Sequence, residues 1–360
     1  LETQVVVIGG GITGCSVLRD LSMRGIDAML FERGNLSEGT TGNFHGLLHS
    51  GGRYAVKDQP AAIECIEENR ILRRIAPQAI EDTGGFFVTL TDEDEEFLPR
   101  FLDGCEACGI PTEVLSAEEA LEKEPALSPD VRTAASVPDG SIDGWDICIG
   151  SVNAAKELGA KVFLFTPVTD ILTENSRVVG IRAKDESSGD EYEVRADYVV
   201  NATGPWTEQT AALADVYVPM ELSPGTMIVL DSRPVQRVIN RCRYPSDGDI
   251  IVPVGTTIVL GTTSKEIEDP DDYAIEQWEV DVVLTECIKM VPKIEEMGIQ
   301  RTYAGVRPLY EPPEELEGKE GGREVSRTHF VLDHEERDGV GGFITITGGK
   351  VTTARLMAED

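Results

Sequence analysis

The sequence predicts an α/β fold: a doubly wound domain on a mostly parallel sheet, with an α+β domain of mixed sheet inserted into it. Three observations support this prediction. A strand–turn–helix–strand pattern opens the chain, two later strands end in small-residue turns, and stretches rich in acidic helices or β-branched runs separate these segments. A chain of 360 residues has room for about two such domains.

The opening segment has the pattern of a Rossmann-type βαβ unit. A β-branched run at residues 4–8 precedes G-x-G-x-x-G at Gly9, Gly11 and Gly14, and a helical pattern follows. These glycines allow a tight turn, close approach of backbone amides to a pyrophosphate, and close packing of helix on strand. Glu32 ends the second strand, where a carboxylate can accept hydrogen bonds from ribose hydroxyls. The unit therefore predicts a dinucleotide site.

Later segments read as further strands of the same domain: 160–171, 178–182, 192–200 and 342–347. The turns that follow the last two of them, 201–206 and 348–350, lie at strand ends, where doubly wound sheets bind ligands, and a helix is expected from Val351. We assign 1–83, 139–215 and 326–360 to the nucleotide-binding domain, and 84–138 and 216–325 to the inserted domain. Within 84–138 a single strand is expected, at 86–90.

Acidic residues dominate the composition. The chain has 65 Asp and Glu against 32 Lys and Arg, a formal net charge of −33, and an isoelectric point near 4.4. Such a charge repels the phosphate backbone of DNA or RNA, so nucleic-acid binding is disfavoured. The acidity is spread along the chain, which predicts a halophilic source, because molar salt shortens the screening length to roughly 3 Å and relieves self-repulsion.

The cysteines and the hydropathy indicate a reducing, cytoplasmic compartment. Seven scattered cysteines do not form a disulfide framework, and no signal peptide is recognised. Cys105 and Cys108 form an isolated C-x-x-C, for which two buried helix thiols are favoured over a redox or zinc site. The longest apolar stretch, 250–260, is shorter than the roughly 18 residues of a membrane span.

A glycine-dense segment, residues 40–54, holds two of the four histidines. His45 and His49 are four residues apart, but the glycines oppose a helix and no third ligand is near, so no metal site is predicted. For His45 we favour a ring satisfied by the backbone of a tight loop. For His49 we favour catalysis or contact with a cofactor.

Five stretches, in order, resemble one known family: VVVIGGGITGCS, HGLLHSGGRYAV, NATGPW, YAGVRPL and GFITITGGK. Together they make the chain similar to flavin-dependent glycerol-3-phosphate dehydrogenases, above all to the large catalytic subunit of the anaerobic, multisubunit type. The similarity runs over all 360 residues. It implies FAD as cofactor and a glutathione-reductase-like FAD domain with an inserted substrate domain, as in D-amino-acid oxidase. The family's large subunit is longer at its C-terminus, a region expected to be absent here.

The resemblance also implies roles for individual residues. FAD would be bound by Gly9, Gly11, Ile12 and Gly14 at the pyrophosphate, Glu32 at the ribose, and by Arg33, Thr40, Thr41, Gly46, Leu47, Val168, Ala202, Thr203, Gly204, Trp206, Gly349, Lys350 and Val351. The substrate phosphate would be bound by Arg53, Tyr54, Arg307, Arg327 and Lys350. Independently of the family, a dianionic substrate of a protein with this negative charge requires such a local cluster of cations.

The implied reaction is oxidation of sn-glycerol 3-phosphate to dihydroxyacetone phosphate, in glycerol catabolism, with a hydride passing to FAD. His49 is the candidate base, since an ordinary pKa of about 6.5 suits proton acceptance at neutral pH. Arg307 or Lys350 would stabilise the developing alkoxide. The family passes electrons to a second flavoprotein subunit, to an iron–sulfur membrane-anchor subunit and to a quinone, which implies anaerobic respiration at the inner face of the cell membrane.

Two alternatives remain. An FAD-dependent 2-hydroxyacid dehydrogenase, acting for example on 2-hydroxyglutarate, shares a His-Ser-Gly in its flavin loop, but a carboxylate substrate does not need so many cations. A non-catalytic flavin subunit that only relays electrons has no need for His49 or the cationic residues.

The acidic composition leads to a first prediction. In dilute buffer the protein is expected to melt at a lower temperature than in molar KCl, because its like charges are then poorly screened. Thermal unfolding followed by circular dichroism at both salt concentrations measures the difference. Equal melting temperatures would contradict a halophilic adaptation.

Overall fold

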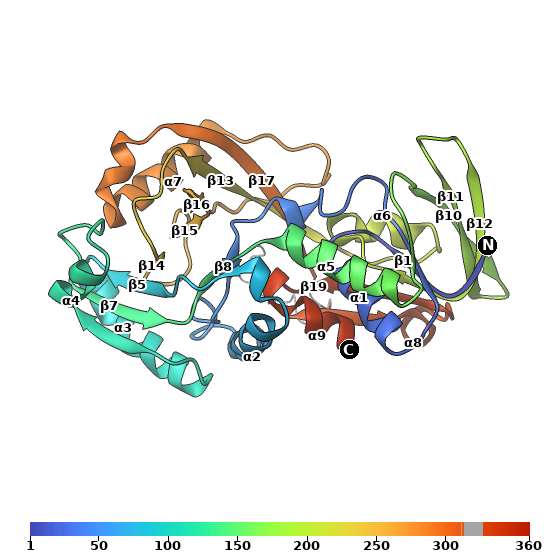
Figure 1. Cartoon of the computed structure of the whole chain (residues 1–360), viewed down its shortest axis with the longest axis horizontal. Coiled ribbons are helices and arrows are strands. Elements are labelled where there is room, and N and C mark those ends of the chain that lie inside the picture. Colours follow the sequence, from blue (N-terminus) through green and yellow to red (C-terminus); the bar gives the residue numbers. More distant parts are fainter. Residues whose placement is uncertain (311, 313–326) are drawn as a thin grey trace. The chain divides into compact units, whose positions relative to one another are not determined.

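The computed structural model describes residues 1–310, 312 and 327–360 and divides the chain into two compact units (Figure 1). Unit 1 comprises Leu1–Gly42, Gly144–Leu222 and Val306–Asp360, and unit 2 comprises Asn43–Asp143 and Ser223–Gly305. The chain thus leaves the first unit and returns to it twice. This alternation agrees with the predicted insertion, and each unit is described separately below.

Unit 1 is built on a sheet with the strand order β10-β11-β12-β1-β2-β9, which β19 and β18 extend beside β12. Strand β1 pairs in parallel with β2 and β12, and β12 pairs in parallel with β19. This is the predicted doubly wound arrangement. The strands are β1 (Glu2–Ile8), β2 (Ala28–Phe31), β9 (Lys161–Phe163), β10 (Val168–Glu174), β11 (Arg177–Lys184), β12 (Glu191–Asn201), β18 (His329–Asp333) and β19 (Phe343–Gly348).

Helix α1 (Ile12–Met23) directly follows β1 and packs against α5 (Gly144–Glu157) and α9 (Ala354–Glu359), as Figure 1 shows. Its buried side includes Cys15 and Leu18, both fully inaccessible to solvent. The short helices α6 (Thr207–Ala212) and α8 (His334–Asp338) complete the unit. The helix predicted from Val351 is present as a 3₁₀ turn at Val351–Thr353 that leads into α9.

Unit 2 contains a mixed sheet with the order β17-β13-β16-β15-β14-β5-β7-β6 and a small sheet β3-β8-β4. In the larger sheet β14 and β5 are parallel, whereas β5 and β7 are antiparallel. The strands are β3 (Leu47–Leu48), β4 (Ile80–Glu81), β5 (Gly85–Thr89), β6 (Glu113–Ser116), β7 (Thr133–Val137), β8 (Gly140–Ile142), β13 (Glu221–Leu230), β14 (Val238–Arg241), β15 (Ile250–Val254), β16 (Thr257–Gly261) and β17 (Ile299–Leu309). The helices are α2 (Gln59–Ile75), α3 (Asp92–Ala107), α4 (Ala117–Lys123) and α7 (Gln277–Met290).

The prediction of a single strand within 84–138 is wrong, because β6 and β7 lie there as well as β5. Strand β7 has the sequence TAASV, whose two alanines are poor strand formers. Those alanines are nevertheless fully buried, since β7 lies between β5 and β6 in the sheet. Tertiary pairing therefore overrides the local preference.

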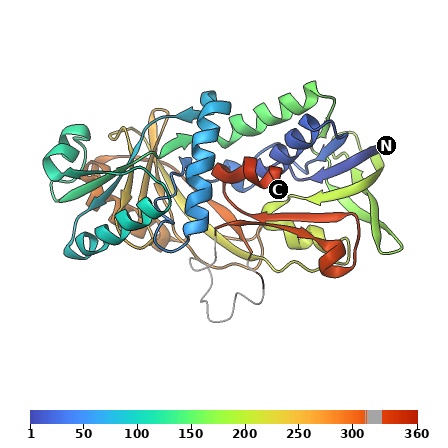
Figure 2. The same cartoon turned by 90° about the horizontal axis from the view of Figure 1, so that it is seen from below.

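The predicted domain boundaries also differ from the units of the structure. Residues 43–83 and 139–143, which we assigned to the nucleotide-binding domain, belong to unit 2, and 216–222 and 306–310 belong to unit 1. The physical reason lies in helix α2, a continuous helix in Figure 2. Its Ala62 and Ile66 are buried in one core cluster with Phe87 and Phe101 of β5 and α3. The end of the assigned range, residue 325, lies outside the described residues.

All seven cysteines are free thiols and buried. Cys105 lies in the last turn of α3 and Cys108 at its C-cap, which confirms the structural interpretation of the C-x-x-C. Burial raises the pKa of Cys105 to about 12, so its thiol is unreactive. Within the described residues, no group of His, Cys, Asp or Glu is arranged to hold a metal ion, and no helix is long and apolar enough to cross a membrane.

His334 is completely buried in unit 1 between two polar partners. Its Nδ1 lies 2.6 Å from Asp338 Oδ2, its Nε2 lies 2.8 Å from Thr345 Oγ1, and its ring stacks on Phe343. Burial lowers the pKa of His334, although Asp338 partly opposes this effect. The imidazole is therefore neutral in the folded protein at neutral pH.

This lowered pKa predicts a pH dependence of stability. The unfolded state takes up a proton at His334 at a higher pH than the folded state does. The contribution of neutral His334 to the free energy of unfolding should therefore be fully present above the ordinary histidine pKa of about 6.5. The free energy of unfolding should decline as the pH falls below that value. Denaturant unfolding in molar KCl between about pH 5.5 and 7.5 measures this slope. His334→Gln should flatten it, and an unchanged slope in that variant would contradict the assignment.

Candidate nucleotide and substrate sites

The glycine-rich turn in unit 1 brings backbone segments closer together than any side chain would allow. Gly9 has a φ of +111°, and a Cβ there would lie 2.6 Å from the carbonyl oxygen of Ala202. A Cβ at Gly14 would lie only 1.9 Å from the carbonyl oxygen of Gly9. Helix α1 thus begins directly against the turn, and the turn after β12 lies beside it. Both glycines have the structural roles that the motif predicts.

The N-terminus of α1 is suited to binding an anion. Its N-cap, Gly11, provides no side-chain cap, and the first turn contains no acidic residue. The amide of Ile12 donates to the hydroxyl of Thr41 at 2.9 Å, which places Thr41 at the helix end. Exposed amides and the positive end of the helix dipole favour a phosphate group at such a position.

Glu32 is held rigidly at the end of β2. Its two carboxylate oxygens accept hydrogen bonds from the amides of Gly10 at 2.5 Å and Gly34 at 2.8 Å. The amide of Thr166 donates to the Glu32 carbonyl at 2.8 Å, so the segment that leads to Val168 passes the same strand end. The carboxylate therefore stands beside the glycine turn, where the motif requires a ribose-binding acid.

The turn after β12 adds further predicted residues to this edge of the sheet. The amide of Ala202 donates to Ile8 at 2.9 Å, and Thr203 is held by the side chain of Asn201. The guanidinium of Arg33 lies 4.0 Å from the centre of the Trp206 ring. The following predicted cofactor residues therefore gather around the ends of β1, β2 and β12: Gly9, Gly11, Ile12, Gly14, Glu32, Arg33, Thr41, Ala202, Thr203, Gly204 and Trp206.

A second glycine turn follows β19. Gly348 and Gly349 both have φ values above +70°, and a Cβ at Gly349 would lie 2.4 Å from the sulfur of Met357. The pairing of β18 with β19 places Arg327 near Lys350, whose ammonium group donates to the Arg327 carbonyl. The structure thus brings these two predicted phosphate-binding residues together. Arg307 is half-buried near the end of β17, in the part of that strand from residue 306 onward that belongs to unit 1.

The predicted residues of unit 2 lie in one loop, residues 45–54, which we call the histidine loop. The His49 side chain is almost fully buried, and its ring centre lies 5.3 Å from that of Tyr54. The Nδ1 of His45 accepts a hydrogen bond from the amide of Leu47 at 3.1 Å. This contact confirms the backbone-satisfied role expected for His45. Gly46 and Leu47, which were predicted as cofactor contacts, also lie in this loop.

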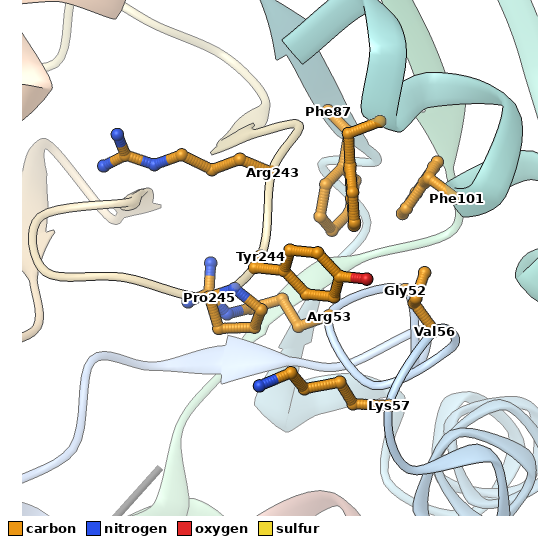
Figure 3. A pocket seen from close by; sticks show the side chains of 10 residues that line it. Gly52, Arg53, Val56, Lys57, Phe87, Phe101, Arg243, Tyr244 and Pro245 are labelled. Carbon is orange, nitrogen blue, oxygen red and sulfur yellow. The ribbon is translucent and has the colours of Figure 1, made fainter. Parts of the chain in front are cut away.

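Arg53 of the histidine loop lines a pocket of unit 2, shown in Figure 3. Its NH2 lies 3.7 Å from the buried carboxylate of Asp249. Asp249 accepts shorter hydrogen bonds from Arg243, at 2.6 and 2.9 Å, and from the amide of Ser246, at 2.5 Å. Burial raises the pKa of Asp249, and the two arginines oppose that shift. The Asp249 carboxylate thus lies near Arg53, but its shortest contacts are with Arg243 and the Ser246 amide.

Sequence analysis missed three residues that line this pocket: Lys57, Arg243 and Tyr244. The ammonium group of Lys57 lies 5.3 Å from the centre of the exposed Tyr244 ring, and Figure 3 shows Arg243 directed away from that ring. Lys57 lies only four residues after Arg53, directly behind the stretch HGLLHSGGRYAV, and could have been considered with it. Tyr244 is distant in the sequence, so only the fold joins it to Arg53.

The tight contact at Gly14 leads to a prediction about cofactor binding. Gly14→Ala should abolish FAD binding, because the added methyl group must push α1 away from the turn that positions its amides. Gly150→Ala is the matched control: it lies in α5, meets no atom within 4 Å, and should be neutral or stabilising by up to about 1 kcal/mol. Bound FAD per chain, measured by absorbance and by flavin fluorescence titration, tests both variants. FAD binding by Gly14→Ala with unchanged affinity would contradict this assignment.

Comparisons with known proteins identify relatives of this chain. The A1 subunit of the anaerobic glycerol-3-phosphate dehydrogenase of Haloferax volcanii is 50% identical over 99% of this chain and 62% of its own length. The corresponding anaerobic glycerol-3-phosphate dehydrogenase subunit of Haemophilus influenzae is 44% identical over 100% of this chain and 63% of its own length. This chain therefore spans less than two thirds of these relatives. The first relative supports the prediction of a halophilic source.

A solved structure supports the fold. The dithionite-reduced L-α-glycerophosphate oxidase of Mycoplasma pneumoniae with bound FAD has a TM-score of 0.79, 17% identity, and coverage of 100% of this chain and 93% of that chain. The predicted fold class is confirmed. A family model described as "FAD dependent oxidoreductase" (DAO) matches residues 4–355. Because this match extends over nearly the whole chain and includes the glycine turn and Glu32, the protein belongs to the DAO family of FAD dependent oxidoreductases, and the predicted cofactor, FAD, is confirmed.

Proposed function

We propose that this chain oxidises sn-glycerol 3-phosphate to dihydroxyacetone phosphate, in line with the glycerol-3-phosphate dehydrogenase names of its curated relatives. The observation that carries the proposal is the placement of two cations, Arg53 and Lys57, at the same pocket wall next to the histidine loop, in a chain with a net charge of −33. A dianionic phosphate needs such a local reversal of charge, and a planar guanidinium binds phosphate through two parallel hydrogen bonds. Lys57 adds a second positive charge to the same pocket.

The remaining assignments follow from the resemblance and the local geometry. On the basis of the resemblance we propose phosphate-binding roles for Tyr54, which adjoins Arg53 in the histidine loop, and for Arg307, Arg327 and Lys350. The fixed carboxylate of Glu32 and the amides at the start of α1 suit the ribose and the pyrophosphate of FAD. We propose Gly46, Leu47, Thr40, Thr41, Val168, Gly349 and Val351 as further cofactor contacts.

The chemistry assigns a separate task to each side chain. When bound, FAD accepts the hydride that leaves the central carbon of the substrate. His49 removes the hydroxyl proton, and its buried ring, packed on Tyr54, has a restricted orientation. Arg307 or Lys350 stabilises the negative charge that develops on the substrate oxygen.

We further propose that the chain works within a complex. Its curated relatives are named as subunits, which supports partner subunits in this case too. The specific partners would be a second flavoprotein and an iron–sulfur membrane anchor, which pass electrons to quinone and hold the chain at the inner face of the membrane. To test this proposal, quinone reduction by glycerol 3-phosphate is measured with the purified chain alone and with membranes from the source organism added. Reduction that occurs only when the membranes are present would support it.

An anaerobic stopped-flow experiment tests the proposed reaction. The FAD-loaded protein in molar KCl is mixed with glycerol 3-phosphate or with 2-hydroxyglutarate, and the absorbance of oxidised flavin is followed. We expect bleaching by glycerol 3-phosphate only, because Arg53 and Lys57 are suited to a dianionic phosphate. Bleaching by 2-hydroxyglutarate alone would favour the 2-hydroxyacid dehydrogenase. Bound flavin that neither substrate bleaches would favour an electron-relay protein.

A further inference from the structure

Both hydrogen-bonding groups of the peptide bond between His49 and Ser50 are held by buried side chains. The carbonyl oxygen of His49 accepts a hydrogen bond from Nδ2 of Asn69 at 3.0 Å. On the other side of the same peptide, the amide of Ser50 donates to Oδ1 of Asp139 at 2.7 Å. Asn69 and Asp139 are 1% and 2% exposed. This peptide is thus held from opposite directions by two groups that water does not reach.

The two holding residues are themselves tied together. Arg73, one turn after Asn69 on α2, donates from Nε to the Asn69 side chain at 2.8 Å and from NH2 to the Asp139 carbonyl at 2.9 Å. Nδ2 of Asn240 donates to the second carboxylate oxygen of Asp139 at 3.2 Å. Asn69, Arg73 and Asp139 therefore form one connected unit, which we call the peptide clamp.

The clamped peptide leads into a tight turn with hydrogen bonds of its own, from the Gly52 amide to Ser50 Oγ at 3.3 Å and from the Tyr54 amide to the Gly51 carbonyl at 2.9 Å. Gly51 and Gly52 follow the clamped peptide and connect it to Arg53. Gly51 has a φ of +98°, and a Cβ there would lie 2.4 Å from the Ala62 carbonyl of α2. Glycines add no side-chain packing, so the path of this turn depends on hydrogen bonds, and those of the clamp hold the peptide at which the turn begins.

We propose that Asp139 and Asn69 are positioning residues, which through the His49–Ser50 peptide orient the His49 ring and the turn that carries Arg53. The inference rests on the proposed function for its kinetic consequences. The orientation of this peptide restrains ψ of His49 and so contributes to the direction in which its side chain leaves the backbone. A displacement of about 1 Å in a reacting group can cost roughly 100-fold in rate, so a rigid peptide at this position has a direct effect on catalysis.

The orphaned oxygen of Asn240 provides a sharp test. Its Oδ1 is buried without a hydrogen-bond partner in the described part of the chain. In Asp139→Asn the new amide can keep its oxygen toward the Ser50 amide and turn its NH2 toward Asn240, whose own amide can rotate to accept. Asp139→Asn should therefore preserve the clamp, whereas Asp139→Ala removes it. Asn69→Ala, which loses the hydrogen bonds without adding volume at this buried position, and Asn69→Leu, which keeps the branching at Cγ but is larger, test the other side.

The experiment combines stopped-flow kinetics with hydrogen–deuterium exchange. In FAD-loaded protein in molar KCl, the rate of flavin reduction by glycerol 3-phosphate should fall about 10-fold or more in Asp139→Ala, Asn69→Ala and Asn69→Leu. In Asp139→Asn the rate should stay within about 3-fold of the wild-type rate. His49→Gln is the reference for loss of the base. Glu279→Gln removes another buried carboxylate of unit 2, bonded to Thr226 and Thr263, and should lower only the melting temperature.

Exchange in the absence of substrate provides a readout that does not depend on activity. Peptides covering residues 47–54 should exchange at least about 10-fold faster in Asp139→Ala than in the wild type, because the Ser50 amide loses its acceptor. In Asp139→Asn the acceptor remains, so exchange should be near the wild-type rate. Unchanged exchange in Asp139→Ala, or equal impairment of both Asp139 variants, would overturn the inference. If glycerol 3-phosphate fails to bleach the wild-type flavin, the proposed function fails, and the exchange result alone decides on the clamp.

Discussion

Unit 1 depends on one close contact, the approach of helix α1 to the turn that precedes it. The helix can start there only because position 14 has no side chain, and the turn can lie beside the end of β12 only because position 9 has none. These contacts bring the ends of β1, β2 and β12 together at one edge of the sheet. The helix amides, the fixed carboxylate of Glu32 and the Arg33–Trp206 pair all derive their positions from this convergence.

In unit 2, buried carboxylates have the corresponding role. Asp139, Asp249 and Glu279 are each nearly inaccessible to solvent, yet each has specific donors. Burial raises the pKa of Asp139 and of Asp249, whereas hydrogen bonds and Lys265 lower the pKa of Glu279 in spite of its burial. These three carboxylates hold backbone amides, hydroxyls and cations in defined positions.

The same electrostatics constrain how an anionic substrate is recognised. In molar salt the screening length is roughly 3 Å, so a cation acts on an anionic ligand only over a short distance. Only groups in near contact matter under those conditions, and their geometry must be set in advance. The contact of Arg53 with Asp249 and the clamp before Gly51 provide such preorganisation within unit 2.

Local patterns were enough to predict the β1–α1–β2 unit, the use of FAD, and a doubly wound sheet with a second, mixed sheet. Such features depend on residues close in sequence, or on glycines whose backbone requirement is the same in any context. Strand β7, the boundary after Gly42 and the pocket residue Tyr244 could not be predicted this way. The Ser50 amide finds its acceptor 89 residues away, and Asn240 lies 101 residues from that same Asp139. Only the folded chain brings such partners together, because burial and pairing between distant segments decide which polar groups must satisfy one another.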